Sequence, residues 1–381
     1  MTIKQGNVYI ADIPISRPHQ LSMHTITKQT IVLVKLTEED GLSGWGEVAT
    51  IGGASYEEMT PEAIKVTIDH YLMPMILGKK AADYACIMND IQKHVKGNRF
   101  AKAAVESALI DLFAKQKGLP AYELLGGKIH DSLPVAWTLA SGDTKKDIEE
   151  AQEALQQRKH RIFKLKIGKG DPNENVRHVL EIKKALGDEV RVTVDVNQSW
   201  DEQTANQCIP KLQAGGIVMV EQPLPEWNEE GMRRLTASSA LSVMADEGAR
   251  SIHDVFRIAK HHVGDSLSLK IPKHGGPHET KKAAAIAESA GMPLYGGTMI
   301  ESTLGTAIAA HVYATIPDMI FGTELFGPLL YQDMVSTNAL IYENYELIIP
   351  ERPGFGITID EDKVLYYARD HETRQKGGNM I

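Results

Sequence analysis

The sequence predicts an α/β protein: a modified TIM barrel of the (β/α)7β type with an N-terminal α+β capping domain. Two observations support this prediction. Strand-like and amphipathic helix-like segments alternate over about 200 residues, which is typical of a closed parallel barrel. Charged residues also close successive apolar strands, at Asp195, Glu221, Asp246 and Lys270, with steps of 26, 25 and 24 residues.

The chain divides into three expected parts. Residues 1–128 form the capping domain, residues 129–330 form the catalytic barrel, and residues 331–381 form a C-terminal segment that packs back on both. The break near LLGGKIHDSL separates the first two parts, because a strand–helix alternation begins only after it. The tail RQKGGNMI is charged and glycine-containing, so we expect it to be disordered.

The capping domain is expected to combine three strands with three helices. The second and third strands flank an EEDG turn, which indicates a hairpin. A polar loop with two histidines, SRPHQLSMHTI, is expected between the first two strands. The expected strands and helices cover residues 6–13, 29–38, 41–48, 61–76, 84–95 and 100–118.

The barrel is expected to contain eight strands and seven intervening helices. Eight parallel strands with helical crossovers favour a closed barrel over an open doubly wound sheet. The expected strands cover residues 133–139, 161–167, 191–196, 217–222, 241–246, 267–271, 292–297 and 319–325.

Composition argues against a nucleic-acid-binding protein and against a membrane-spanning protein. The net charge is −9 and no long basic run occurs, so nucleic acid is not an expected partner. No segment reaches the roughly 20 apolar residues of a membrane span, and the N-terminus lacks a signal-peptide pattern. The two cysteines, Cys86 and Cys208, are interpreted as small buried apolar residues. We therefore expect a cytoplasmic protein without a membrane partner.

Three carboxylates carry the metal hypothesis. Asp195, Glu221 and Asp246 offer only oxygen, which Mg²⁺ and Mn²⁺ prefer. Each one alone could instead be a helix N-cap or a loop ion pair. Parallel strand ends meet at one rim of a barrel, so the three together favour a metal site with open positions. The neighbouring Glu247 is expected to point away from Asp246, since side chains alternate along a strand, and therefore to support the ligands from behind or to be structural.

Three lysines are expected to face the same pocket. In FKLKI, Lys164 and Lys166 share one face of a strand, and Lys270 lies on a strand across the barrel. They could be charge partners of the carboxylates and nothing more. The functional interpretation is that mutual repulsion and a nearby cation lower a lysine pKa toward ~7–8, which suits proton transfer. Such a site could stabilise the enediolate formed when a carbon next to a carboxylate loses its proton.

The chain resembles the muconate-lactonizing subgroup of the enolase superfamily, and within it the muconate and chloromuconate cycloisomerases. The KxK pair, the Asp…Glu…Asp set and the sixth-strand lysine match this subgroup, and the resemblance covers nearly the whole chain. AWTLASGDT and GTELFGPLL are its most discriminating stretches. The sequence departs at ADEG, LKIPKHGG and GTMIESTLGT, where the subgroup has ADES, LKIAKNGG and GTMLEGTIGT. These departures bear on the shape of the pocket.

The resemblance implies roles for the charged residues. Lys166 is the general acid/base, Lys164 its electrostatic companion, and Lys270 acts on the other face of the substrate. One Mn²⁺ or Mg²⁺ ion per subunit is held by the three carboxylates named above. Glu324 is a supporting acid and Asn197 a polar group behind the ligands.

The resemblance also implies two mobile cap loops, at residues 19–26 and 50–56, which close over the substrate. Ile51, Ser55 and Tyr56 are candidate specificity residues. His24 is a candidate substrate contact. The YGGT segment that ends at Thr298 either makes room for substrate or forms a phosphate cradle, and Thr298 is a candidate substrate-binding residue. His261 and His262 are expected to be solvated.

The implied activity is the reversible cycloisomerization of cis,cis-muconate, a small dicarboxylate, to muconolactone in the β-ketoadipate route of aromatic catabolism. The alternatives within the subgroup are chloromuconate cycloisomerization, N-acylamino acid racemization, o-succinylbenzoate synthesis and dipeptide epimerization. Two other classes are a non-catalytic metal-binding protein and an unrelated metal-dependent barrel hydrolase. The resemblance further implies a homo-oligomer, namely an octamer.

Overall fold

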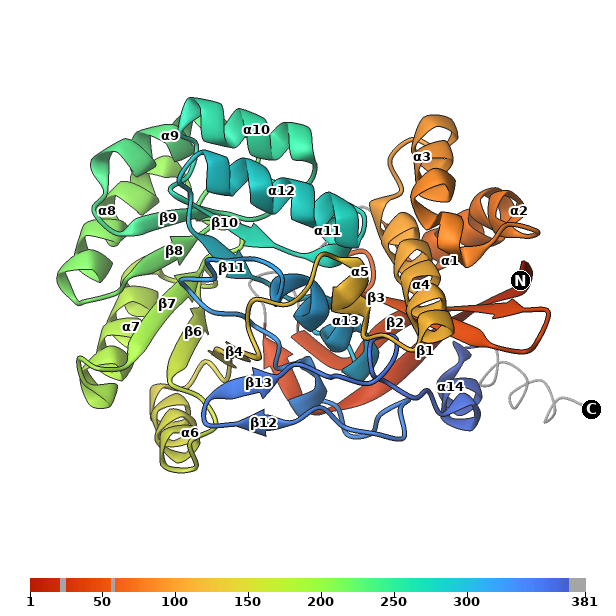
Figure 1. Ribbon diagram of the computed structural model, residues 1–381. Helices are drawn as coiled ribbons and strands as arrows, with labels where there is room; N and C mark the ends of the chain where they lie inside the picture. Colours follow the sequence, from red (N-terminus) through yellow and green to blue (C-terminus); the bar gives the residue numbers. More distant parts are fainter. Residues whose placement is uncertain (21–24, 56–58, 370–381) are drawn as a thin grey trace, which may run out of the picture.

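The barrel is built on seven parallel strands. The computed structural model describes residues 1–20, 25–55 and 59–369. The strands are hydrogen-bonded in the order β11-β10-β9-β8-β7-β6-β5 (Figure 1). Their bounds are Trp137–Leu139 (β5), Ile162–Lys166 (β6), Arg191–Asp195 (β7), Met219–Glu221 (β8), Ser242–Ala245 (β9), Ser266–Leu269 (β10) and Leu294–Gly296 (β11).

A single residue takes the place of the expected eighth strand. Thr323 forms parallel bridges to Val135 on one side and to Gly296 of β11 on the other. Its N–H donates to Pro134 O at 2.9 Å and its carbonyl accepts from Ala136 N at 2.7 Å. These bonds join the two edges of the sheet, so the (β/α)7β class is confirmed, although segment 319–325 is much less regular than expected.

Helices connect every pair of successive barrel strands. Side-chain caps define several of their starts: Asp143 accepts from Lys145 N and Lys146 N, and Ser251 forms a capping box with Asp254. The helices are Thr144–Gln156 (α6), Pro172–Leu186 (α7), Glu202–Ala214 (α8), Glu229–Ser238 (α9), Ile252–His261 (α10), Ile271–His274 (α11), Pro277–Ser289 (α12) and Thr303–Tyr313 (α13).

The cap joins an antiparallel sheet to a group of helices. Its strands are ordered β1-β2-β3, and the β2–β3 hairpin is confirmed. Residues 61–76 form one run interrupted by a π turn just before Pro74, whose missing N–H cannot continue the α-helical bonds. The elements are Ile3–Gln20 (β1), Thr25–Glu38 (β2), Ser43–Thr50 (β3), Pro61–Thr67 (α1), Ile68–Leu72 (η1), Met73–Ile76 (α2), Ala81–Asp83 (η2), Tyr84–His94 (α3), Arg99–Lys117 (α4) and Ala121–Leu124 (α5).

The polar segment expected as a loop from residue 16 is largely strand. β1 continues to Gln20, and His19 pairs with Ile26 after a register shift that begins at Pro14. β1 lies at the edge of its sheet, where a proline such as Pro18 costs no ladder bond. The loop prediction is therefore wrong for the described part, because composition alone does not distinguish an edge strand from a loop. The central residues 21–24 lie outside the described chain.

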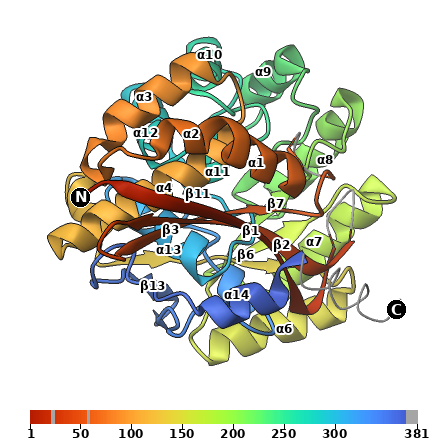
Figure 2. The same ribbon diagram turned by 90° about the vertical axis from the view of Figure 1, so that its right-hand side faces the viewer.

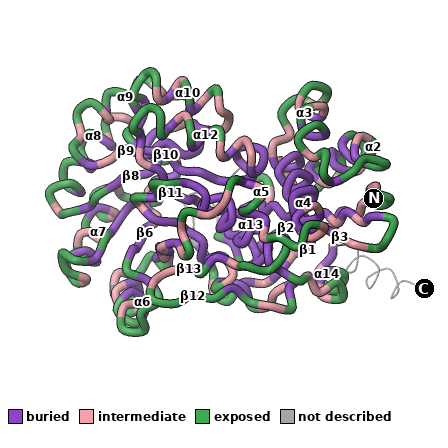
Figure 3. Tube along the Cα trace, in the orientation of Figure 1, coloured by how far each residue is buried: buried purple, intermediate pink, exposed green. Residues whose placement is uncertain are grey.

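Small residues bring the cap sheet close to helix α4. A methyl group at Gly46 would lie only 2.0 Å from the Ala104 carbonyl oxygen, and one at Gly44 only 2.5 Å from that of Ala108. The sheet and α4 thus pack backbone to backbone, and both α4 and the barrel helix α13 are mostly buried (Figure 3). Gly118 in the left-handed conformation ends α4 (φ +67°), as expected from its sequence.

The C-terminal segment contacts both other parts. Strands Tyr342–Glu343 (β12) and Glu346–Ile348 (β13) form a sheet with Ser132–Pro134 (β4) at the base of the barrel. Helix Glu361–Tyr367 (α14) lies against β1 (Figure 2), and Lys35 forms an ion pair with Glu361 at 2.6 Å. The expected disordered tail, residues 374–381, lies outside the described chain.

Two smaller expectations have mixed outcomes. Cys208 is buried as expected, whereas Cys86 is exposed on α3, so its interpretation as a buried residue is wrong. His261 and His262 are exposed, which confirms that expectation. Within the described ranges, no helix combines the length and the apolar character needed to cross a bilayer.

A buried histidine makes stability depend on pH. His160 stacks on Trp137 with ring centroids 5.0 Å apart, and its Nδ1 lies 3.0 Å from Val135 O. Burial lowers the pKa of His160 to about 4, below its ordinary value near 6.5. The unfolded chain therefore binds one more proton between these two pH values, and stability is complete above pH 6.5 and declines as the pH falls toward 4.

We predict that His160→Asn flattens this acid dependence. Between pH 6.5 and about 4, wild-type unfolding free energy should fall by about 1.4 kcal/mol per pH unit more steeply than that of the variant. Urea titrations at a series of pH values measure both slopes. Parallel slopes would show that His160 is not held neutral by the fold.

Candidate active site

Three carboxylates lie side by side where neighbouring barrel strands end. Asp195 closes β7 and is in register with both Lys166 of β6 and Glu221 of β8. Asp246 follows the last residue of β9, next to β8. All three carboxylates are at most 1% exposed. The N-cap of α8 is Asp201 and that of α10 is Ser251, so neither Asp195 nor Asp246 is a helix cap.

The three predicted lysines reach these carboxylates from both sides. Lys164 Nζ lies 2.6 Å from Glu221 Oε2 and 2.7 Å from Glu324 Oε2. Lys166 Nζ lies 2.5 Å from Asp195 Oδ2. Lys270 Nζ lies 2.5 Å from Asp246 Oδ2. β6 and β10 are the second and sixth of eight positions in the barrel, so the lysines approach from opposite walls.

The expectation of lowered lysine pKa values is wrong for two of the three lysines as they stand here. Burial by itself would lower the pKa of Lys164, but Glu221 and Glu324 together hold it well above its usual value. Burial likewise opposes the charged form of Lys270, and Asp246 and Glu221 outweigh it and raise the pKa. The lowered values were expected from repulsion between the lysines and from a nearby cation, whereas pairing with carboxylates, which was the alternative, dominates here.

Two acids show that the cluster has an excess of negative charge. Burial, and then the neighbouring Asp195, raises the pKa of Glu221 to about 8. Burial, and then Asp246, raises the pKa of Glu247 to about 8 as well. Burial, the larger cause, disfavours the charged form of each acid, and the neighbouring carboxylates add to the effect.

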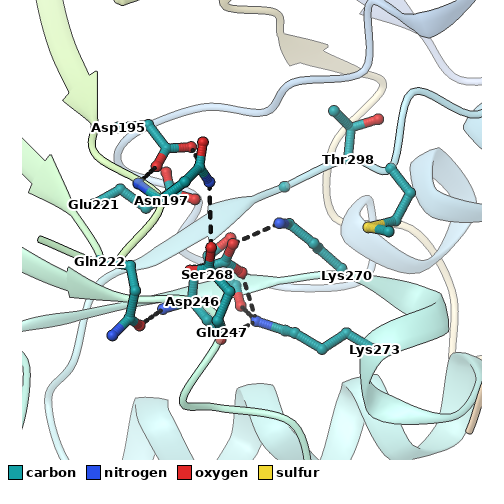
Figure 4. A network of polar contacts seen from close by, with 12 residues as sticks. Asp195, Asn197, Glu221, Gln222, Asp246, Glu247, Ser268, Lys270, Lys273 and Thr298 are labelled. Atoms are coloured by element: carbon teal, nitrogen blue, oxygen red, sulfur yellow. Dashed lines mark hydrogen bonds and ion pairs between the residues drawn. The ribbon is translucent and has the colours of Figure 1, made fainter. Parts of the chain in front are cut away.

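Glu247 has the supporting place behind the carboxylates that was expected of it, but its side chain does not point in the expected direction. It was expected to point away from Asp246, yet it is 1% exposed and its Oε1 accepts from Asn197 Nδ2 at 3.2 Å (Figure 4). β9 ends at Ala245, so the strand alternation on which the prediction depended no longer applies two residues later. Glu247 therefore belongs to the same carboxylate cluster.

Two residues with a left-handed backbone conformation hydrogen-bond to the predicted metal ligands. Asn197 (φ +44°) donates its N–H to Asp195 Oδ1 at 2.9 Å and accepts from Lys166 Nζ at 3.3 Å. Gln222 (φ +35°) accepts from Asp246 N at 2.9 Å (Figure 4). Non-glycine residues with positive φ are uncommon and concentrate at functional sites. Sequence reasoning named Asn197 but missed Gln222.

Sequence reasoning also missed a fourth lysine. Lys273 of α11 is 1% exposed, and its Nζ donates to Asp246 Oδ1 at 2.8 Å, Asp246 O at 2.9 Å and Ser268 O at 2.7 Å (Figure 4). Asp246 thus lies between Lys270 and Lys273. The spacing of the two lysines could have indicated this. Lys270 and Lys273 are three residues apart at the start of a helix, which places both side chains on one face.

The three carboxylates are suitable ligands for a hard divalent cation, although lysine ammonium groups lie against them in this structure. Within the described residues, no three Asp, Glu, His or Cys side chains have the arrangement of a metal site. Each of Asp195, Glu221 and Asp246 instead has an ammonium within 2.6 Å. Glu221 Oε1 is buried without a hydrogen-bond partner among the described residues, and all three side chains offer oxygen only. A buried carboxylate oxygen that lacks a hydrogen-bond partner and lies among other carboxylates would be stabilised by such an ion.

A small cavity adjoins the cluster beneath the cap. Its volume is about 20 Å³, room for about one water molecule. Lys166 and Lys270 both line it, together with His19, Ile51, Thr138, Thr298, Ile300, Glu324 and Phe326. Cap and barrel therefore enclose one space between the two lysines.

Some of the candidate substrate-binding residues line this cavity and others do not. Ile51 and Thr298 line it, and the Thr298 hydroxyl donates a hydrogen bond to Glu301 Oε2 at 2.5 Å. Ser55 is exposed, and its hydroxyl donates to Gly52 O at 2.8 Å. Tyr56 and His24 lie outside the described residues. His19, which sequence reasoning named only as the first residue of a cap loop that closes over the substrate, is 1% exposed on the cavity wall, and burial lowers its pKa to about 3.

Comparisons with known proteins agree with this geometry. Residues 5–126 match the N-terminal domain of the mandelate racemase / muconate lactonizing enzyme family, and residues 146–363 match the enolase C-terminal domain-like family. The chain belongs to the enolase superfamily, in the mandelate racemase / muconate lactonizing enzyme family. It is an enzyme, and members of this family use a divalent metal ion.

The similar proteins span nearly the whole chain. Muconate cycloisomerase 1 of Acinetobacter baylyi is 46% identical over 96% of this chain and 99% of its own length. Chloromuconate cycloisomerase of Pseudomonas putida is 42% identical over 97% of this chain and 100% of its own. The crystal structure of muconate lactonizing enzyme from Pseudomonas fluorescens, complexed with muconolactone, has a TM-score of 0.95 at 46% identity and covers 97% of this chain and 99% of its own.

We predict that Lys273→Met destabilises the barrel mouth. The substitution keeps the apolar stem but removes a buried ammonium from one carboxylate and two carbonyl oxygens, at an expected cost of about 2–4 kcal/mol. Urea denaturation measures the change, with Lys260→Met, an exposed lysine of α10, as the matched control. Equal stabilities for the two variants would contradict a role for Lys273 in holding Asp246.

Proposed function

We propose that the chain is a muconate cycloisomerase, which interconverts cis,cis-muconate and muconolactone. One observation carries the proposal: Lys166 and Lys270 line the same small cavity from opposite walls, next to three buried carboxylates. This arrangement suits a planar, conjugated dicarboxylate that gains a proton on one face. The 46% identity to muconate cycloisomerase 1 over nearly the full length supports the same substrate.

The reaction requires one proton and no redox cofactor. One carboxylate oxygen of muconate adds to the double bond of the other half, which forms the lactone C–O bond and moves an electron pair toward the second carboxylate. Lys166 then donates a proton to the carbon next to that carboxylate and later recovers one from solvent. Lys164, held between Glu221 and Glu324, supplies fixed positive charge beside the reacting atoms, and Lys270 faces the opposite side of the substrate.

Asp195, Glu221 and Asp246 would hold the metal ion, and we propose Mn²⁺ or Mg²⁺, one ion per subunit. When bound, such an ion supplies positive charge that stabilises negative charge developing on a substrate carboxylate. The chemistry of the three ligands supports this choice, because hard cations prefer oxygen donors. Glu247 and Asn197 remain behind the ligands and hold their orientation.

The remaining expectations belong to the same proposal. Residues 1–128 act as the cap, residues 129–330 as the catalytic barrel, and residues 331–381 as a segment that packs on both. Ile51, Ser55 and Tyr56 of the cap select the substrate together with Thr298. The enzyme acts in the cytoplasm as a homo-oligomer, an octamer by family resemblance.

Chloromuconate is the second candidate substrate. Chloromuconate cycloisomerases are 42–43% identical to this chain over 97% of its length, which is nearly as similar as the muconate enzymes. Turnover of muconate and chloromuconate in parallel, with chloride release as a second readout, separates the two. A kcat/KM higher for chloromuconate than for muconate would reverse the assignment.

We predict that Lys166→Ala lowers kcat for muconate by about 10³-fold, because it removes the group that protonates carbon. Loss of the ultraviolet absorbance of muconate measures turnover. Lys169→Ala is the matched control, since Lys169 is exposed in the loop that follows the same strand. Full turnover by Lys166→Ala would contradict the assigned role.

We predict that chelation abolishes turnover and that added Mn²⁺ restores it. EDTA treatment followed by dialysis should leave less than about 1% of the activity, because the charge on the substrate would lose its stabilising cation. Titration with Mn²⁺, followed by electron paramagnetic resonance, should show one tight site per chain that weakens in Glu221→Gln. Full activity in a preparation stripped of metal would contradict the metal assignment.

A further inference from the structure

A second and larger cleft lies where the cap meets the outer face of the barrel. Its volume is about 630 Å³, and none of its lining residues lines the cavity between Lys166 and Lys270. Figure 1 shows α11 between α12 of the barrel and α4 of the cap, and α11 contacts both. The polar residues of the cleft are Asn89, Gln92, Arg99, Lys102, Glu106, Ser251, His253, His274, His278, Glu279 and Lys282.

Three helices begin at this cleft. α4 starts at Arg99, α10 at Ile252 and α12 at Pro277, and residues of all three first turns line it. The N-terminus of a helix carries partial positive charge and unpaired N–H groups. Helix ends from the cap and from the barrel therefore favour negative charge at the same place.

Two cations of the cleft have no carboxylate partner. Within the described residues, neither Arg99 nor Lys102 has an Asp or Glu oxygen within 4.0 Å, whereas Lys282 lies 2.7 Å from Glu279. Glu106 accepts from the His278 side chain at 2.8 Å. Lys102 is 2% exposed, and its Nζ donates to Gln92 Oε1 at 2.7 Å. Burial, and then Lys96 and Arg99, lowers the pKa of Lys102 to about 8, while Glu279 partly offsets this effect. Glu106 and Glu279 also line the cleft, but neither lies within ion-pair distance of Arg99 or Lys102.

A buried imidazole nitrogen in the same wall lacks a partner. His274 is 3% exposed, and its Nδ1 lies 3.2 Å from Arg250 O, so Nδ1 carries the proton and Nε2 is the acceptor. Nε2 is buried with no hydrogen bond among the described residues. Arg99 packs on the adjacent Gly275, where an added methyl group would lie 3.5 Å from Arg99 Cγ. Position 274 is one of the places where the sequence departs from its subgroup, which has asparagine there.

We propose that this cleft binds a small phosphate-type oxyanion that bears one protonated oxygen, between α4 of the cap and α11 of the barrel. Arg99 and Lys102 bind its unprotonated oxygens, and its O–H donates to His274 Nε2. Inorganic hydrogen phosphate offers both kinds of oxygen near neutral pH. A fully ionised dicarboxylate offers no such donor, so the cleft differs in chemistry from the cavity proposed for muconate.

The bound oxyanion would connect the two domains next to the catalytic groups. α11 begins directly after Lys270 and contains Lys273, which holds Asp246. His274 is the last residue of that helix. An anion held by Arg99 and His274 therefore fixes α4 of the cap against the helix that positions two lysines of the site.

Calorimetric titration of the full chain at constant ionic strength and pH 7.5 tests the proposal. We expect one equivalent of inorganic phosphate to bind with a Kd of about 1 mM or lower. Glycerol phosphate, a phosphomonoester whose phosphate group has mostly lost its O–H at this pH, should bind as weakly as sulfate; affinity equal to that of inorganic phosphate would contradict the role of the O–H. Sulfate, which has no O–H at this pH, and succinate should bind at least about tenfold more weakly. Absence of phosphate binding at 10 mM, or equal affinity for phosphate and sulfate, would overturn the proposal.

Two variants separate the contributions of charge and of the hydrogen bond. Lys102→Met should weaken phosphate and sulfate together by at least about tenfold, while His274→Leu should remove the preference for phosphate over sulfate. Lys93→Met, an exposed lysine of α3 outside the cleft, is the control and should bind like the wild type. If Lys102→Met does not fold, Arg99→Gln at a half-buried position tests the same charge. Unchanged binding in the variants that fold would overturn the site.

Discussion

Charge held away from water at the mouth of the barrel is the constraint on which the rest of the structure depends. Four lysines and five carboxylates meet there, and most of their side chains are at most 5% exposed. An ammonium or a carboxylate is stable in such a place only when it is paired and hydrogen-bonded. The strand register, the two left-handed residues Asn197 and Gln222, and helix α11 all keep these pairs in place.

The capping domain contributes a further buried carboxylate, which contacts the barrel. Glu47 of β3 accepts from Ser302 N at 2.7 Å and Gly305 N at 3.1 Å, at the N-terminus of α13, where a carboxylate is favoured. Burial raises the pKa of Glu47 to about 7, and the nearby Glu301 contributes to the rise. The Ser302 hydroxyl also donates to Glu47, and Ser302 stands where the related subgroup has glycine. A cap strand and a barrel helix thus share one buried acid.

The anionic excess around Glu221 and Glu247 explains how such a site suits a metal. Burial and neighbouring carboxylates raise the pKa values of both acids, so added positive charge would favour their ionised forms. Lysine pairing and metal binding then compete for the same oxygens, and substrate chemistry can use the lysines that a metal would release.

Local patterns in the sequence determined the barrel strands, the Asp195, Glu221 and Asp246 set and the Lys164–Lys166 pair. Alternation along a strand and the spacing of βα units are short-range properties that a single sequence records. Only the tertiary structure decided that Glu247 turns inward, that Lys273 reaches Asp246, that Thr323 alone replaces the last strand and that the pKa values of Lys164 and Lys270 rise. Each of these depends on distances between residues of different elements, and charges interact through space and not along the chain.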